Sequence, residues 1–414
     1  MPDHDQSDGV RDADRVVPLR RRAGGRDRPL DAVIVGGGAI GLACAWRAAE
    51  RGLRVRVLER EEPGAGASGV AAGMLAPVGE VSWGEEPGLR IALASASAWP
   101  GFADELEAAA EMDTGYARLG ALHVALDRDE AAELRRRFDL LRSLGLPAEW
   151  LRPSACRELE PGLSPSCAAG IRADGEAAVD PGLLVRCLQA AAERAGAEVV
   201  VHAEVIAAQI AADVLVGVRT ADGHEHRAKS VVLASGAWSG AATWLPSSAR
   251  PPVRPVKGQV VVARGSRKEP VCERIVASER VYLVPRADGR LIIGATVEER
   301  GFDTQVTAGG VLELLREAYR ALPDIAELEL VESVAGLRPA TPDNLPLIGP
   351  GGLDGLVLAT GHWRNGILLA PITADAIAGL LSGEKPSPEV AAASPERLGL
   401  GAGLLAPVPE EVPR

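Results

Sequence analysis

The chain is poor in aromatic residues and in cysteine. Its 414 residues include three Phe, three Tyr and seven Trp, so the hydrophobic cores must be built mainly from Leu, Val, Ile and Ala. The five cysteines form no CxxC pair and show no metal-ligand spacing: Cys44, Cys156, Cys167, Cys187 and Cys272. Such a dispersed, odd-numbered set is typical of buried or free thiols in a reducing compartment, and no nearby residue supplies the base that a catalytic cysteine needs.

Long apolar runs and a basic excess are also missing. No segment reaches the roughly 18 apolar residues that a membrane span requires. The formal net charge of -12 disfavours a nucleic-acid-binding surface, because neutralising phosphates requires a basic face. Arg20-Arg21-Arg22 before the uncharged stretch 32–46 resembles an export signal, but this stretch is rich in glycine and runs straight into Arg47. We therefore expect a cytoplasmic protein that binds neither nucleic acid nor membranes.

The length of the chain allows two domains, each with its own core. Residues 1–29 and 385–414 lack periodicity and are rich in charged residues, Pro, Gly or Ala, which predicts disordered tails. No linker interrupts the region between the tails, so we expect two interleaved domains between which the chain crosses several times. Asp-Gly pairs at 222–223 and 288–289 predict β-hairpins within this region.

A glycine-rich turn has the pattern of a dinucleotide-binding site. Gly36-Gly37-Gly38-Ala39-Ile40-Gly41 matches GxGxxG and stands between a predicted strand, 32–35, and a predicted helix, 40–51. A second predicted strand ends at Glu59, an acid at the roughly 20-residue distance from which a carboxylate binds ribose hydroxyls. The glycines permit a tight turn, a close approach to pyrophosphate and close packing of the helix, whose N-terminus favours phosphates. The pattern predicts binding of FAD or NAD.

Several further segments resemble one flavoprotein family. The run Gly66-Ala67-Ser68-Gly69-Val70-Ala71-Ala72-Gly73-Met74-Leu75-Ala76-Pro77 consists mostly of small residues, which let a backbone lie against a large planar ligand. Other matching segments follow in order, at residues 232–239, 254–259, 282–286, 294–296, 336–339 and 361–371. Together, over residues 30–384, these segments resemble the FAD-dependent D-amino acid oxidase superfamily and, within it, the glycine oxidases of thiamine biosynthesis.

The resemblance implies a mixed α/β (α+β) fold. In such a fold a Rossmann-type FAD-binding domain is interleaved with an antiparallel-sheet substrate-binding domain. The FAD-binding domain would comprise residues 30–90, 170–250 and 331–384, and the substrate-binding domain residues 91–169 and 251–330. Family members are commonly assemblies, so a homo-oligomer is expected. Because no Cys or His stands in a convincing position for a covalent link, we expect non-covalent FAD.

The resemblance also assigns roles to individual residues. Arg338 is expected to grip the substrate carboxylate with its planar guanidinium, Tyr282 to donate a hydrogen bond to it, and Arg364 to contribute to substrate binding beside the flavin. The residues expected to contact FAD are Gly36, Gly38, Ala39, Ile40, Gly41, Glu59, Arg60, Ala67, Ser68, Ala72, Gly73, Met74, Val205, Gly236, His362, Trp363, Asn365, Gly366, Ile367 and Leu368. No metal site is expected, because His224 and His226 lack a third ligand.

The implied activity is FAD-dependent oxidative deamination of glycine with oxygen as the electron acceptor. The Cα hydrogen would leave as a hydride to the flavin, giving an imine, or glyoxylate and ammonia, together with hydrogen peroxide. The imine would feed the synthesis of the thiamine thiazole. An enzyme of the same fold acting on sarcosine or small D-amino acids, as an oxidase or a dehydrogenase, is the alternative. A non-catalytic flavin-binding module is disfavoured by the presence of Arg338, Tyr282 and Arg364.

Overall fold

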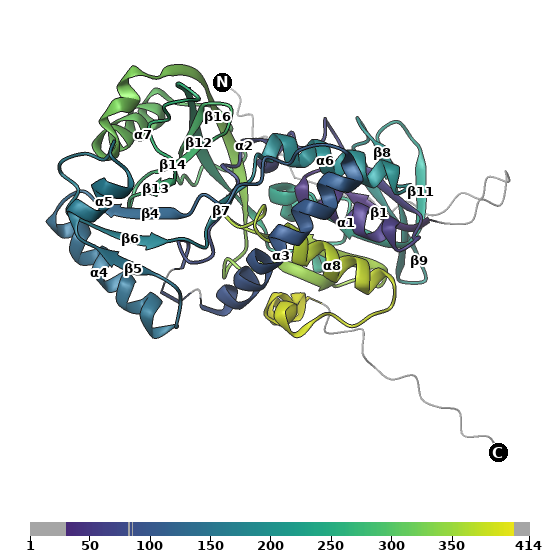
Figure 1. The fold of residues 1–414 in the computed structure, drawn as a ribbon. Coiled ribbons are helices and arrows are strands. Elements are labelled where there is room, and N and C mark those ends of the chain that lie inside the picture. The colour runs from purple at the N-terminus through teal and green to yellow at the C-terminus, as the bar shows by residue number, and fades with distance from the viewer. Residues whose placement is uncertain (1–29, 82, 85, 401–414) are drawn as a thin grey trace, which may run out of the picture.

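The computed structural model describes residues 30–81, 83–84 and 86–400 and shows two lobes lying side by side (Figure 1). Each lobe is built around one large sheet, and the chain crosses between the lobes several times. The tail predicted at residues 1–29 and the last part of the other tail, 401–414, lie outside the described residues. Within the described part, no helix is both long and apolar enough to cross a membrane.

The first lobe contains a mainly parallel sheet of the Rossmann type. Its strands, in spatial order, are β17 (Leu347–Pro350), β18 (Leu356–Thr360), β11 (Glu225–Leu233), β1 (Leu30–Val35), β2 (Val55–Leu58) and β8 (Glu198–Val200). The strands from β18 to β8 pair in parallel, whereas β17 is antiparallel to β18. Strands β9 (Val205–Ala211) and β10 (Val214–Thr220) extend the sheet from β11 in antiparallel fashion, so the hairpin predicted at residues 222–223 is confirmed.

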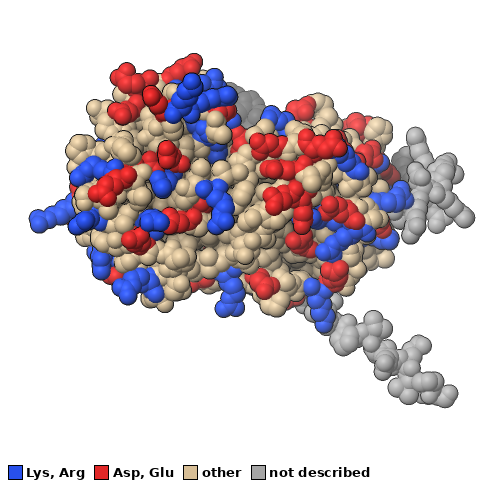
Figure 2. Space-filling view, in the orientation of Figure 1, with Lys and Arg blue, Asp and Glu red and all other residues tan. Residues whose placement is uncertain are grey.

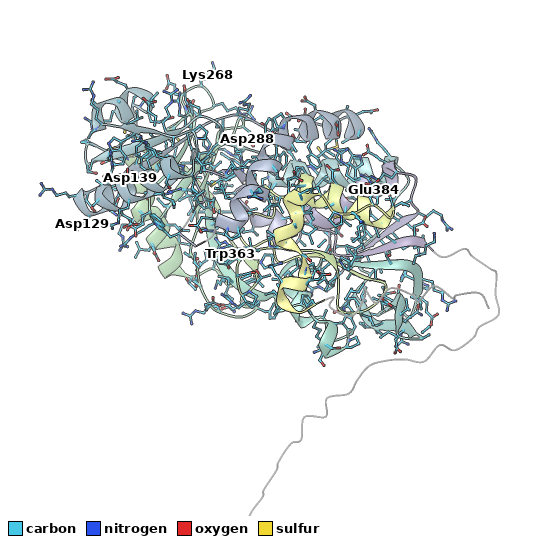
Figure 3. The ribbon with its side chains drawn as sticks, turned by 90° about the horizontal axis from the view of Figure 1, so that it is seen from below. Asp129, Asp139, Lys268, Asp288, Trp363 and Glu384 are labelled. Atoms are coloured by element: carbon cyan, nitrogen blue, oxygen red, sulfur yellow. The ribbon has the colours of Figure 1, made fainter. Side chains whose placement is uncertain are left out.

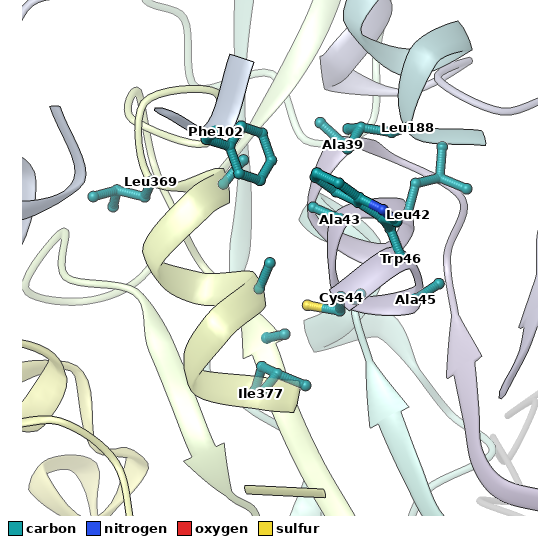
Figure 4. Close-up of a cluster of buried hydrophobic side chains, with 14 of the residues drawn as sticks. Ala39, Leu42, Ala43, Cys44, Ala45, Trp46, Phe102, Leu188, Leu369 and Ile377 are labelled. Carbon is teal, nitrogen blue, oxygen red and sulfur yellow. The ribbon is translucent and has the colours of Figure 1, made fainter. Parts of the chain in front are cut away.

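Helices α1 (Ala39–Glu50), α6 (Pro181–Arg194) and α8 (Ala370–Leu381) contact this sheet, and α3 (Glu86–Ala110) packs on α6 and α8. Trp46 of α1 stands edge-on to Phe102 of α3, with ring centroids 5.3 Å apart, and Ile377 of α8 belongs to the same buried cluster (Figure 4). Most other members of the cluster are Ala, Leu or Val. These small and aliphatic side chains let the helices pack closely, as the scarcity of aromatic residues requires.

The second lobe contains a mainly antiparallel sheet. Its strands, in spatial order, are β16 (Glu329–Ala340), β12 (Arg254–Arg264), β15 (Arg290–Gly294), β14 (Tyr282–Pro285), β13 (Ile275–Ala277), β4 (Ala121–Ala125), β6 (Ala169–Ala173) and β5 (Glu149–Leu151). Only the β13–β4 pair among these is parallel. The hairpin predicted at residues 288–289 is confirmed as β14–β15. Helices α4 (Arg128–Ser143), α5 (Pro153–Leu159) and α7 (Ala308–Ala321) pack on this sheet.

Three segments lie elsewhere than the sequence predicted. Helix α3, most of which was expected in the substrate-binding domain, buries Trp99 and Leu106 in the core of the first lobe. Strand β16, largely expected in the FAD-binding domain, pairs with β12 over its whole length. Residues 385–400, expected in a disordered tail, include two 3-10 helices, η4 (Pro388–Ala393) and η5 (Pro395–Leu398), and η4 packs on α3 and β17.

Acidic and basic side chains are mixed over the surface. In the view of Figure 2, Lys and Arg alternate with Asp and Glu across both lobes, and no continuous basic area covers the described residues of that face. A nucleic-acid backbone therefore meets no extended basic face on this side of the molecule.

Candidate functional site

A large cavity lies between the two lobes. It encloses about 680 Å³ and extends from the carboxyl ends of β1 and β2 to the face of the antiparallel sheet. Ligands of open parallel sheets bind at the carboxyl ends of the strands. The cavity is lined by these residues that the sequence assigned to the site: Gly36, Gly38, Ala39, Ile40, Glu59, Arg60, Ala67, Ser68, Ala72, Gly73, Met74, Val205, Gly236, Tyr282, Arg338, His362, Trp363, Arg364, Asn365, Gly366 and Ile367.

The glycine-rich turn places the N-terminus of α1 in the cavity wall. Gly36 has a φ of +115°, and Gly38, which has no side chain, immediately precedes the helix. The amide of Ala39 donates a hydrogen bond to Ser68 Oγ at 3.0 Å, which joins the turn to the run of small residues. Gly41 is the third residue of the helix, where a Cβ would be 1.9 Å from the carbonyl oxygen of Gly36. Gly41 therefore serves packing, and the start of the helix, which lines the cavity, suits a pyrophosphate.

Glu59 and Arg60 follow β2 at the cavity wall. One carboxylate oxygen of Glu59 accepts a hydrogen bond from the amide of Gly37 at 2.6 Å, and the other accepts one from the amide of Glu61 at 2.9 Å. These bonds fix the carboxylate beside the glycine-rich turn, where an acid suits ribose hydroxyls. The guanidinium of Arg60 lies over the ring of Trp238, 4.8 Å from its centroid, and both residues line the cavity.

Two glycines leave room for Arg338 and Tyr282 on the antiparallel sheet. Arg338 belongs to β16 and Tyr282 to β14, and the strands β12 and β15 separate them. A Cβ on Gly258 of β12 would lie 2.4 Å from both terminal nitrogens of Arg338. A Cβ on Gly294 of β15 would lie 2.5 Å from the hydroxyl of Tyr282. Because neither glycine has a side chain, the guanidinium and the phenol extend over the sheet toward each other and reach the cavity.

The surroundings of this pair suit the binding of a carboxylate. Nη1 of Arg338 donates to the backbone carbonyls of Thr296 at 3.0 Å and Lys257 at 3.3 Å, which holds the plane of the guanidinium. Burial raises the pKa of Tyr282, and the neighbouring Arg338 lowers it in part. Tyr282 is therefore a protonated hydrogen-bond donor at neutral pH.

Arg364 lies in the loop between β18 and α8. Its Nε is 3.1 Å from Oε2 of Glu80, and both residues line the cavity. Trp363, labelled in Figure 3 where the two lobes meet, has a φ of 49° and donates its amide to the carbonyl of Pro339 at 2.9 Å. This hydrogen bond links the loop to β16 next to Arg338. It therefore fixes the position of Arg364 relative to Arg338.

The two ends of the same loop are buried. Nε2 of His362 lies 3.1 Å from Oγ1 of Thr373, and burial lowers the pKa of His362 to about 3, so the imidazole is neutral at physiological pH. Leu368 does not line the cavity; its carbonyl accepts hydrogen bonds from Ser95 Oγ at 2.6 Å and Trp99 Nε1 at 2.8 Å. These bonds anchor the loop to α3, so Leu368 supports the loop rather than the cavity wall.

The sequence patterns did not identify several residues that shape the cavity. Gly258 and Gly294 stand in segments that match the family, and a glycine inside a strand is itself a sign of close approach by another group. Trp238 lies in another such segment, yet its stacking on Arg60 has no sequence signature. Glu80 has no signal in the sequence either, because its partner Arg364 lies far away along the chain.

A dinucleotide fingerprint and an arginine–tyrosine pair in one cavity define a dinucleotide-dependent oxidoreductase. A family model described as FAD dependent oxidoreductase (DAO) matches residues 31–380. The chain belongs to this family.

Relatives within the family share most of the chain. A glycine oxidase of Geobacillus kaustophilus is 38% identical over 359 residues, covering 85% of this chain and 92% of the relative. The crystal structure of glycine oxidase from Geobacillus kaustophilus superposes with a TM-score of 0.83 and 36% identity, covering 89% of this chain and 98% of that one. A bifunctional protein ThiO/ThiG of Trichormus variabilis is 38% identical over 360 residues, which is 86% of this chain and 53% of the relative. The chain thus spans about half the length of that bifunctional relative.

FAD is the cofactor of this family, and the cavity fits it. The N-terminus of α1 and the carboxylate of Glu59 provide the partners that a pyrophosphate and a ribose require. A Cβ on Gly38 would lie 3.2 Å from Ser68 Oγ, so the missing side chain keeps this part of the cavity open. Among the described residues, no group of three or more His, Cys, Asp or Glu side chains is arranged to hold a metal ion.

Proposed function

We propose that the protein catalyses oxidative deamination of glycine, with FAD as cofactor and oxygen as acceptor. The observation that carries this proposal is the pairing of Arg338 with Tyr282 at the substrate end of the cavity. A planar guanidinium can hold both oxygens of a carboxylate, and a phenol can donate a further hydrogen bond. A small amino acid held in this way is fixed by its carboxylate, and its Cα hydrogen can be directed at the cofactor.

The residues around this pair would orient the substrate and exclude water. When bound, FAD supplies a hydride acceptor for the Cα hydrogen. We propose that Arg338, Tyr282 and Arg364 bind the substrate, and that the predicted contact residues hold the cofactor, apart from Gly41 and Leu368. The neutral His362 and the Gly366 and Ile367 backbone would lie along the cofactor. The products are the imine, or glyoxylate and ammonia after hydrolysis, together with hydrogen peroxide.

Two relatives support glycine as the substrate and thiamine biosynthesis as the pathway. The similarity to a glycine oxidase extends over most of both chains, and the bifunctional relative carries the name ThiO/ThiG. We propose that the imine feeds the synthesis of the thiamine thiazole. Oxidation of sarcosine or of a small D-amino acid requires the same carboxylate clamp, so only the substrate profile separates these activities.

We also propose that the protein is a cytoplasmic homo-oligomer. All five cysteines are buried free thiols, which suits a reducing compartment. Leu312 and Tyr319 of α7 and Leu330 of β16 are exposed, and apolar side chains of this kind favour subunit contacts. Light scattering of the purified protein tests the assembly, and a monomeric mass would contradict it.

A peroxide-coupled assay in air tests the proposed function, with glycine, sarcosine and several D-amino acids as substrates. We expect peroxide with glycine at a higher kcat/KM than with the bulkier D-amino acids. A preference for sarcosine or D-alanine would assign the alternative activity. No peroxide and no change of flavin colour with any of these substrates would contradict an enzymatic role in amine oxidation.

A further inference from the structure

A cluster of buried and half-buried charged and polar side chains lies next to the turn that carries Glu80. It comprises His123 of β4, Arg137 of α4 and Glu176 of the turn between β6 and β7 (Ala177–Ala178). Glu176 is fully buried and His123 is 4% exposed, and none of the three lines the cavity. Burying an ionised group costs several kcal/mol unless nearby partners compensate. The contacts that these three side chains make are therefore important for the local structure.

Glu176 holds the turn that carries Glu80. One oxygen of the Glu176 carboxylate accepts a hydrogen bond from the amide of Gly79, and the other lies 3.5 Å from Nε2 of His123. A Cβ on Gly79 would lie 2.6 Å from Oε1 of Glu176 and from Cε1 of His123. The backbone at Gly79 is therefore pressed against both side chains, and the direction in which Glu80 leaves this turn depends on them.

Arg137 supplies the cation of the cluster. Its Nε and Nη2 are buried and have no hydrogen-bond partner among the described residues. Burial lowers the pKa of Arg137, while the negative charges of Glu176 and Glu80 raise it in part and Arg364 lowers it further. Arg137 thus stands within electrostatic reach of both carboxylates and of the cavity arginine.

The cluster is connected to the cavity through one ion pair. Glu80 is the residue after Gly79, and its carboxylate lies 3.1 Å from Nε of Arg364. Glu80 and Arg364 both line the cavity, together with Tyr282 and Arg338. A shift of the turn at Gly79 would therefore move the carboxylate that orients Arg364.

We propose that Glu176 and Arg137 are positioning residues for substrate binding, which act through Glu80 on Arg364. Glu176 fixes the turn by its hydrogen bond to Gly79, and the buried Nε and Nη2 of Arg137, which have no hydrogen-bond partner among the described residues, place a positive charge near the carboxylates of Glu176 and Glu80. The inference rests on the proposed function, because Arg364 is taken to bind the substrate. It adds to that function two residues that do not line the cavity.

The test compares Glu176→Gln and Arg137→Met with Glu160→Gln. Glu160 is a matched control, because it is also a buried carboxylate of the second lobe, accepts backbone amides and pairs with Arg274, but does not line the cavity. The ligands are glycine, for KM and kcat, and glycolate, which carries the carboxylate without the amine and is followed by the flavin absorption spectrum. We expect Glu176→Gln and Arg137→Met to raise KM and the glycolate Kd about tenfold, with FAD content retained and kcat changed less. Glu160→Gln should lower Tm and leave both binding constants unchanged.

A double-mutant cycle tests whether Glu80 transmits the effect. In a Glu80→Gln background, the additional change Glu176→Gln should alter KM and the glycolate Kd less than twofold, because the connecting carboxylate is already gone. Additive effects in the cycle, or binding constants in Glu176→Gln and Arg137→Met equal to those of the wild type, would overturn the proposal. Failure of the proposed function itself is distinguishable, because the wild type would then not oxidise glycine while glycolate binding still reports on the cluster.

Discussion

The guanidinium of Arg338 lies across Gly258, a residue of the neighbouring strand, in space that any side chain at Gly258 would occupy. Gly294 has the same relationship to Tyr282 on the next pair of strands. The two long polar side chains therefore extend toward each other over the neighbouring strands β12 and β15. The substrate end of the cavity owes its shape to these missing side chains as much as to the polar groups themselves.

Substituting Gly258 tests this arrangement. We expect Gly258→Ala to displace the Arg338 guanidinium and to lower kcat/KM for glycine by about tenfold to a hundredfold, because small misplacements of a substrate-binding group are costly. FAD content should stay the same, since Gly258 belongs to the antiparallel sheet and the glycine-rich turn to the other sheet. Gly309→Ala is the control, because a Cβ there meets no atom within 4 Å. A Gly258→Ala enzyme with normal kinetics would show that the guanidinium has room elsewhere.

Charge and geometry at Arg338 can be separated by two substitutions. We expect Arg338→Leu to lower kcat/KM by about a hundredfold or more, because removing one partner of a buried charge pair costs about 2–5 kcal/mol. Arg338→Lys keeps the charge but lacks the planar fork, so its activity should lie well below that of the wild type. Both variants should bind FAD normally, as measured by the flavin spectrum. Wild-type activity in Arg338→Lys would contradict a two-point grip on the carboxylate.

The glycine-rich turn gives a prediction about cofactor retention. Gly41→Ala places a Cβ 1.9 Å from the carbonyl oxygen of Gly36, so α1 must move away from the turn that faces the cavity. We expect purified Gly41→Ala to contain little FAD and to have a lowered Tm. Gly101→Ala, in the open part of α3, serves as the control because no atom lies within 4 Å of its Cβ position. Full FAD occupancy in Gly41→Ala would disprove this role of Gly41.

His362 makes stability depend on pH. Burial lowers its pKa to about 3 in the folded protein, from an ordinary value of 6.5. As the pH falls between these values the unfolded chain takes up a proton that the folded chain does not, so acid favours unfolding. The slope from this one group is at most about 1.4 kcal/mol per pH unit. We expect the Tm of the wild type to fall more steeply between pH 7 and pH 5 than that of His362→Asn, and equal slopes would contradict the burial of a neutral imidazole.

Local patterns in the sequence predicted the parts of the molecule that depend on neighbouring residues. The turn at Gly36, the strand ending before Glu59 and both Asp-Gly hairpins follow from short-range rules, and the structure has them in place. The contacts of Gly258 with Arg338 and of Glu80 with Arg364 join residues far apart in the chain, so no short-range rule reveals them.

The lobe to which each segment belongs was harder to predict, because it also depends on contacts between residues far apart in the chain. Helix α3 and strand β16 have the composition of many helices and strands, and their lobe is decided by which long-range surface they bury. The segment 385–400 looked like a tail because it is rich in Pro, Glu and Ala. It is held instead by a few buried small side chains, among them Val390 and Ala393.

A small amino acid held by Arg338 and Tyr282 is expected to deliver its Cα hydrogen to FAD as a hydride. Anaerobic mixing of the purified flavoprotein with glycine, followed at the flavin absorption band, tests it most directly. We expect complete loss of the oxidised flavin colour in the wild type, return of the colour with peroxide when oxygen is admitted, and bleaching that is about a hundredfold slower or more in Arg338→Leu under the same conditions. Retention of the oxidised colour by the wild type at saturating glycine, or equally fast bleaching in Arg338→Leu, would contradict it.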